Sequence, residues 1–188
     1  MSRCFYDNVY YFITTPTVKH FPYFDSEEKK SIILKRMEKS QELFQLNDFD
    51  YSILSHHYHI ISYFHKGEVI PKLLQMINGG SAYELNKLVE NRKPVWGEYF
   101  VYVINDERLL AKVRGYVVGN PLKHGEVKML TDLERYPFSS FYSLTQRFGK
   151  EQVISWIQSV VLLNDTEFIN EFYKKTKLNR LKSVRGFV

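Results

Sequence analysis

The stretch Phe49-Asp-Tyr-Ser-Ile-Leu-Ser-His-His-Tyr-His-Ile-Ile-Ser-Tyr-Phe64 guides the interpretation of the rest of the chain. It is rich in aromatic and β-branched residues, which favour β-strands. His57 and His59 lie two positions apart, so on a strand they project from the same face. Two imidazoles placed in this way can bind one metal ion. Taken alone, such a pair is more often structural than metal-binding.

We expect this stretch to form two strands, Asp50–Ser55 and His57–Phe64, with a sharp bend near His56. Continued alternation through the bend assigns these residues to the face of the two histidines: Phe49, Tyr51, Ile53, Ile61 and Tyr63. It assigns these to the opposite face: Tyr58, Ile60 and Phe64.

Two further aromatic and β-branched runs, Val9–Thr15 and Tyr99–Ile104, predict the remaining strands. Helical spacing and capping residues predict helices over about residues 25–45, 69–77, 82–91 and 107–119. We expect Gly79-Gly80 to interrupt the second helix and Pro121 to end the last one. The order β-α-β-β-α-β-α is typical of the α+β, ferredoxin-like fold, a split βαβ antiparallel sheet with helices on one face. The other face is then free to hold a site.

The length of 188 residues suits one domain with an appendage. We predict a core domain over residues 1–142 and a helical extension over 143–188, with helices near 150–162 and 165–173. The single cysteine, Cys4, excludes an internal disulfide and fits a reducing compartment. No apolar run reaches the roughly 18–20 residues that span a bilayer, and the N-terminus lacks a signal-peptide core. The expectation is a cytoplasmic protein that does not enter membranes.

Positive charge is concentrated after Glu171, where there are no acidic residues. The basic residues there are Lys174, Lys175, Lys177, Arg180, Lys182 and Arg185. The whole chain carries +5, so residues 1–171 carry about −1. A basic tail can bind a polyanion such as DNA, although a solvated C-terminus is an equally good interpretation of charge alone.

Tyr116 and Asn120 lie four residues apart on the last predicted core helix and therefore share a face. Gly115 and Gly119 beside them remove bulk, which allows a backbone or a ligand to approach closely. Taken singly, Tyr116 reads as a core residue and Asn120 as a helix-end residue before Pro121.

Together these residues resemble a known constellation. A His-hydrophobic-His strand followed by Tyr-x-x-x-Asn-Pro on a helix is similar to the single-tyrosine HUH transposases, and most of all to the REP-associated tyrosine transposases. The similarity extends over about residues 10–142. The segments that carry it are Leu54–Ile61, Gly80–Lys87, Pro94-Val-Trp96, Tyr99–Glu107, Arg114–Gly125 and Tyr136-Pro-Phe-Ser-Ser140. Ser55-His56 replaces the usual Pro-Asn, and Val101 stands where an Asp is common, so local loop geometry and DNA specificity can differ from the family's.

The resemblance implies a metal-dependent single-stranded DNA endonuclease and strand transferase that acts at hairpin or palindromic DNA. Tyr116 would be the nucleophile and form a 5′-phosphotyrosine. His57, His59 and Asn120 would bind one Mg²⁺ or Mn²⁺, a donor set suited to a Lewis acid at phosphate. Lys123 and the basic tail would contact DNA. His56 is a candidate base, although it is expected to point away from the metal face. Relatives occur as monomers and as homodimers, and the protein would associate with the nucleoid when bound to DNA.

Two alternatives remain open at the level of sequence. One is a domesticated, non-catalytic nucleic-acid-binding protein of the same fold. The other is a structural zinc protein that uses His56, His57, His59 and His65, which the lack of a usual structural-zinc spacing disfavours.

Overall fold

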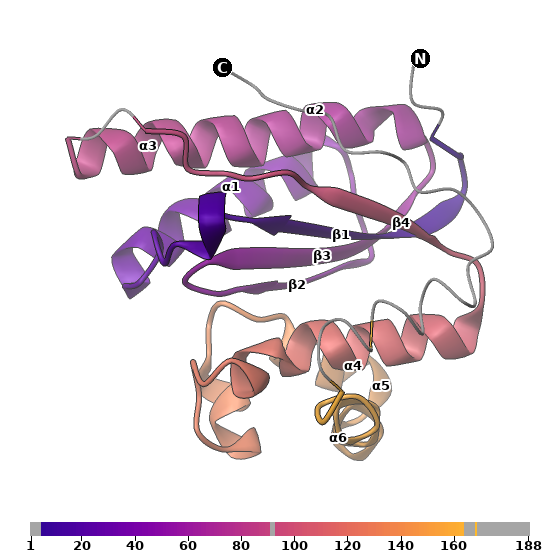
Figure 1. The fold of residues 1–188 in the computed structure, drawn as a ribbon. Coiled ribbons are helices and arrows are strands. Elements are labelled where there is room, and N and C mark those ends of the chain that lie inside the picture. Colours follow the sequence, from indigo (N-terminus) through magenta and orange to yellow (C-terminus); the bar gives the residue numbers. More distant parts are fainter. Residues whose placement is uncertain (1–4, 91–92, 164–167, 169–188) are drawn as a thin grey trace.

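A four-stranded antiparallel sheet lies between two helical layers in the computed structural model, which describes residues 5–90, 93–163 and 168 (Figure 1). The strands are β1 (Val9–Pro16), β2 (Phe49–Ile53), β3 (His57–Phe64) and β4 (Phe100–Ile104), in the order β2-β3-β1-β4. All three pairings are antiparallel. This is the predicted α+β, ferredoxin-like architecture.

The crossover helices cover one face of the sheet, as predicted. They are α1 (Glu27–Leu43), α2 (Ile70–Leu74) and α3 (Gly80–Leu88), with short 3-10 segments at Val18–His20 (η1) and Gly67–Val69 (η2). Ser26 caps α1 by accepting a hydrogen bond from the Lys29 backbone N–H. Ile33 and Met37 point inward from α1 and are fully buried against Tyr58 and Ile60 of β3.

The tyrosine-bearing helix α4 (Glu107–Lys123) lies across the other face, and α5 (Phe141–Phe148) and α6 (Lys150–Gln158) lie beside it (Figure 1). A 3-10 segment, η4 (Leu130–Arg135), links α4 to α5. Asp106 caps α4 through a 2.7 Å hydrogen bond from the Leu109 N–H. Val113 and Val117 of α4 pack on Phe12 and Ile61 from the sheet, so this face has its own hydrophobic core.

Three local predictions were wrong. The Gly79-Gly80 pair does not break the helix: Gln75–Gly79 forms a π-helical turn, labelled η3, that runs directly from α2 into α3. A Cβ on Gly80 would instead lie 2.7 Å from Nε of Arg36 in α1, so the end of that side chain would have to shift to accommodate alanine. Pro121 does not end α4, which continues to Lys123. Because proline has no backbone N–H, one backbone hydrogen bond is missing in the last turn of the helix.

The third error concerns the face of β2. The register places Ser52 opposite His59 and Asp50 opposite Ile61, so these two side chains share the histidine face. Phe49 and Ile53 instead join the core under α1 to α3. The turn at residues 54–56 is not strand, so the alternation does not carry through it.

None of the helices in the described part of the chain combines the length and apolarity needed to cross a membrane. The predicted helix over 165–173, the basic tail and Cys4 lie outside the described residues, apart from Phe168.

Candidate active site

His57 and His59 project from β3 toward α4, near the end of the sheet where β3 begins. Their ring centroids are 4.7 Å apart. Pro16 and Thr14 of β1 stand opposite them on one side, and Ser52 of β2 stands opposite His59 on the other. His59 is therefore flanked by strands on both sides and His57 by β1 on one side, and their exposed fractions are 4% and 6%.

Tyr116 and Asn120 face these histidines from one side of α4, one turn apart. Asn120 is fully buried, and its Oδ1 lies 2.9 Å from Nε2 of His57. The ring of Tyr116 lies 5.4 Å from that of His59. The structure thus brings together four residues that the sequence separates by about sixty positions. Because Pro121 does not end the helix, Asn120 is held within regular backbone rather than in a loop.

Several polar atoms at this point have no hydrogen-bond partner among the described residues. They are both ring nitrogens of His59 and the Nδ2 of Asn120. Unpaired buried polar atoms are costly and usually mark a ligand, ion or water site. Burial, with the nearby rings of His57 and His124, holds the pKa of His59 well below its ordinary value. The imidazole is therefore neutral near pH 7, the form that binds a metal.

The donor set fits the divalent cation that the resemblance implies. Two imidazoles and one amide oxygen lie together here, and such ligands leave other positions of an ion open for phosphate oxygens. His57 Nε2 and Asn120 Oδ1 form a 2.9 Å hydrogen bond with each other, so these two candidate ligand atoms already point to the same place.

The Tyr116 ring is enclosed by three other groups. Phe168 stacks on it in parallel at 3.8 Å, Phe12 of β1 meets it edge-on at 6.1 Å, and the Lys123 ammonium lies 4.9 Å from its centroid. Tyr116 is consequently only 4% exposed. The predicted DNA contact Lys123 thus lies beside the predicted nucleophile.

The expectation that His56 points away from the metal face is wrong, and His124 also lies at the site. The His56 ring lies 4.5 Å from His57 and 5.4 Å from His124, and His124 lies 4.9 Å from His57. His56 therefore borders the site rather than pointing away, because it belongs to the turn. His124 follows Asn120 by four residues, a helical spacing that could have indicated its position.

The four histidines of the zinc alternative do not come together. His65 packs on Tyr63 at the far end of β3, eight positions from His57, which is about 26 Å along a strand. Within the described residues, no group of three His, Cys, Asp or Glu side chains could hold a metal ion, so the candidate site depends on the amide of Asn120.

Comparison with solved structures shows which known fold this chain shares. No protein-family model matches the sequence, and no curated protein matches it. Among solved structures, the chain is similar to the REP-associated tyrosine transposase bound to a REP hairpin, with a TM-score of 0.61 and 17% identity over 78% of this chain and 85% of that one. The fold is that of the REP-associated tyrosine transposase. A candidate transposase from Deinococcus radiodurans R1 also matches, with a TM-score of 0.43 and 14% identity over 62% of this chain and 93% of that one.

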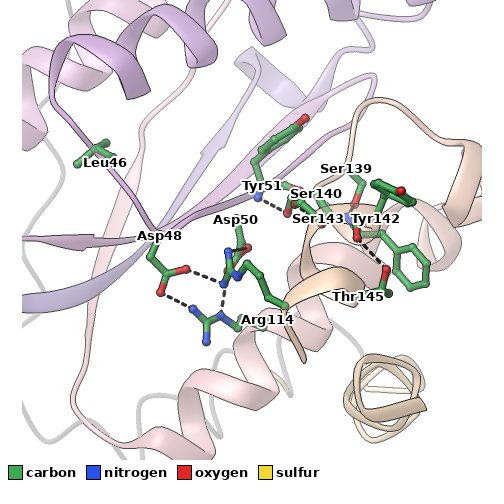
Figure 2. Close-up of polar contacts among 12 residues, drawn as sticks. Leu46, Asp48, Asp50, Tyr51, Arg114, Ser139, Ser140, Tyr142, Ser143 and Thr145 are labelled. Carbon is green, nitrogen blue, oxygen red and sulfur yellow. Dashed lines mark hydrogen bonds and ion pairs between the residues drawn. The ribbon is translucent and has the colours of Figure 1, made fainter. Parts of the chain in front are cut away.

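Within this transposase fold, the segment Tyr136-Pro-Phe-Ser-Ser140 covers the edge of β2. Ile53 N–H donates to the Phe138 carbonyl at 2.8 Å, and Ser140 N–H donates to the Tyr51 carbonyl at 3.0 Å. Tyr51 N–H in turn donates to the Ser140 hydroxyl at 2.9 Å (Figure 2). Phe138 and Ser140 therefore pair with backbone groups of the edge strand β2, next to the histidine strand β3.

A buried ion cluster fixes α4 and α5 to the same strand. Arg114 donates to Asp50 at 2.9 Å and to Asp48 at 2.6 Å (Figure 2). Arg147 of α5 bonds the same two carboxylates at 3.1 Å and 2.6 Å. Burial raises the pKa of Asp50 despite both guanidinium groups. Because Arg114 lies two residues before Tyr116, this cluster sets the position of α4 over the sheet.

A second brace fixes the turn before His57. Glu126 accepts a hydrogen bond from the Ser55 N–H at 2.8 Å and one from the buried Lys30 ammonium of α1. Burial alone would raise the pKa of Glu126, but these two donors outweigh it and lower the pKa below its ordinary value. The chain after α4 is thereby tied to the turn that leads into the histidine strand.

The glycines beside the tyrosine serve helix packing. A Cβ on Gly115 would lie 2.5 Å from the Trp156 carbonyl carbon and oxygen in α6, and one on Gly119 would lie 2.9 Å from Ile157 Cγ2. The predicted close approach is that of a backbone rather than of a ligand. Lys174, Lys175, Lys177, Arg180, Lys182 and Arg185, the predicted tail contacts for DNA, lie outside the described residues.

Proposed function

We propose that this protein is a metal-dependent single-stranded DNA endonuclease and strand transferase that cleaves beside hairpin or palindromic DNA. The observation that carries the proposal is the contact between two elements: His57 and His59 on β3 with Asn120 and Tyr116 on α4. The orphaned nitrogens of His59 and Asn120 support it, since they suit a ligand that completes their bonding.

His57, His59 and Asn120 would hold Mg²⁺ or Mn²⁺, which when bound polarises the scissile phosphate and offsets charge on its oxygens. Tyr116 attacks the phosphorus through its hydroxyl oxygen and loses its proton. The bond from phosphorus to the 3′ oxygen breaks, and that oxygen takes up a proton to become a free 3′-hydroxyl. The 5′ end stays on Tyr116 as a phosphodiester, so a second 3′-hydroxyl can reverse the reaction without ATP.

The surrounding residues have matching roles. Lys123, 4.9 Å from the Tyr116 ring, adds positive charge where the phosphate must approach. His56 and His124 border the metal ligands and are candidates to receive or return the proton. The solved neighbour was determined with a REP hairpin, which supports a hairpin substrate. The tail lysines and arginines would add phosphate contacts.

The test is formation of a covalent protein–DNA adduct. Wild-type protein is incubated with a single-stranded hairpin oligonucleotide and Mn²⁺ or Mg²⁺ and then run on a denaturing gel. We expect a slower band that is lost with EDTA and in Tyr116→Phe, with Tyr142→Phe as the control because Tyr142 is 63% exposed on α5. Hairpin binding without an adduct, for every hairpin tested, would support the non-catalytic alternative.

A further inference from the structure

The connection between β1 and α1 borders the candidate site and is held rigidly against it. Thr17, 1% exposed, donates from its backbone N–H to the His56 carbonyl at 2.9 Å. Its hydroxyl contacts the same carbonyl at 3.0 Å and the Phe21 carbonyl at 2.7 Å. Phe24 N–H donates to the Ser55 carbonyl at 2.9 Å. Both ends of this loop are therefore fastened to the turn that leads to His57.

The loop between these anchors has an unusual backbone. Lys19 and His20 are consecutive non-glycine residues with left-handed φ values of 56° and 53°. Such conformations are strained for L-residues, and two in succession are unusual. Lys19, His20 and Phe21 of this loop all have exposed side chains.

The exposed side chains suit a single strand of nucleic acid. Phe21 is 57% exposed, and its ring lies 4.8 Å from that of the half-buried Tyr23. An exposed phenyl ring backed by a second ring offers a platform on which an unpaired base can stack. A base in a duplex cannot use it, because its faces are already covered by its neighbours.

Charge around the loop favours a polyanion. Lys19 forms no ion pair with a described residue. Two acidic residues in adjoining segments already have cationic partners: Asp25 pairs with Lys29 at 2.6 Å, and Glu126 pairs with Lys30. The loop thus presents a cation next to an aromatic surface without a competing free carboxylate on either of these residues.

A continuous line of rings joins the loop to the predicted nucleophile. His20 lies 6.0 Å from His56, and His56 lies 4.5 Å from His57. His57 lies 4.7 Å from His59, which lies 5.4 Å from Tyr116. A strand cleaved at Tyr116 would therefore need to extend only a few nucleotides to reach Phe21.

We propose that the loop Val18–Tyr23 binds the unpaired nucleotides next to the cleaved phosphate, with Phe21 stacked on a base and Lys19 on a phosphate. This assignment rests on the proposed function for the identity of the cleaved strand. It makes Phe21 a specificity-determining residue that distinguishes a flanking single strand from the hairpin stem.

The test is DNA binding in a Tyr116→Phe background, so that no cleavage occurs. The probes are a fluorescein-labelled single strand of about 12 nucleotides with randomised sequence and a blunt-ended hairpin without unpaired flanks. Phe21→Ala is expected to weaken single-strand binding about 5- to 150-fold, the effect of losing one base stack, and to leave the hairpin affinity unchanged. Lys19→Ala is expected to weaken single-strand binding and to reduce the slope of the logarithm of the binding constant against the logarithm of salt concentration by about 0.7.

Two matched variants sharpen the result. Tyr83→Ala removes a 69% exposed ring from α3, on the face of the sheet away from Tyr116, and is expected to change neither affinity. Phe100→Ala removes a 39% exposed ring that stands opposite Thr14 at the β4 edge. If the parent fails to bind the single strand, if Phe21→Ala binds it normally, or if Phe100→Ala alone weakens it, the assignment is wrong.

The adduct assay separates this proposal from the proposed function. A single-strand defect in Phe21→Ala without any adduct in the wild type would keep the loop as a single-strand binding site and remove the nuclease. An adduct in the wild type with normal single-strand binding by Phe21→Ala would support the nuclease and remove the loop assignment.

Discussion

Replacing Gly115 with alanine tests how the C-terminal helices support the tyrosine helix. The new Cβ would lie 2.5 Å from backbone atoms of Trp156, whereas ordinary contacts begin near 3.4 Å, so α6 would have to move by about 1 Å. Alanine gains up to ~1 kcal/mol over glycine in helix propensity. Overpacking against rigid backbone costs about 1–3 kcal/mol. With the full gain, the expected net loss of unfolding free energy is about 0–2 kcal/mol.

Two other glycines provide the controls. A Cβ on Gly79 meets nothing within 4 Å, so Gly79→Ala should stabilise the protein by about 0.5–1 kcal/mol. A Cβ on Gly119 would lie 2.9 Å from Cγ2 of the fully buried Ile157, so Gly119→Ala should fall between the other two in stability. Urea denaturation with a common m-value measures all three. A Gly115→Ala protein as stable as Gly79→Ala would refute the close packing of α4 on α6.

Three further variants test the supports and the metal ligands. Arg114→Met leaves the buried Asp50 with only Arg147 and should lower the unfolding free energy, measured by urea denaturation, by about 3–5 kcal/mol. Arg147→Met removes a partly exposed side chain and should lower it by about 1 kcal/mol. Equal losses would contradict the role given to Arg114 in the ion cluster. The lowered pKa of Glu126 contributes stability above pH 4.5 that is lost as pH falls through the folded-state value, so the advantage of wild type over Glu126→Gln should be full at neutral pH and shrink below pH 4.5. Mn²⁺ should raise the melting temperature of wild type and of His65→Ala but not of His59→Ala; an unchanged rise in His59→Ala would remove that residue from the ligand set.

The sequence predicts the parts of this structure that depend on local pattern. The strand alternation places His57 and His59 on one face of their strand, and the helical spacing places Tyr116 and Asn120 on one face of their helix. Their meeting depends on the ferredoxin-like order of elements, which the sequence also indicates. The structure confirms that fold, and it brings the four side chains together.

What the sequence could not predict depends on distant partners. Asp50 and Ser52 face the histidine side because the pairing register restarts after the turn, and no local pattern reveals that. The roles of Gly80 and Gly115 depend on Arg36 and Trp156, which approach from other helices. Phe168 joins the tyrosine through a stacking contact from the far end of the chain. Such contacts are set by tertiary packing rather than by propensity.

The most direct test of the central claim is to identify the amino acid that becomes joined to DNA. The adduct formed with Mn²⁺ and a hairpin oligonucleotide is digested with nuclease and trypsin, and the peptides are sequenced by mass spectrometry. We predict a nucleotide linked through its 5′-phosphate to Tyr116, and none on Tyr116 when His57 or Asn120 is replaced by alanine. A nucleotide on another tyrosine, or on Tyr116 in the His57→Ala protein at the wild-type level, would contradict the assignment.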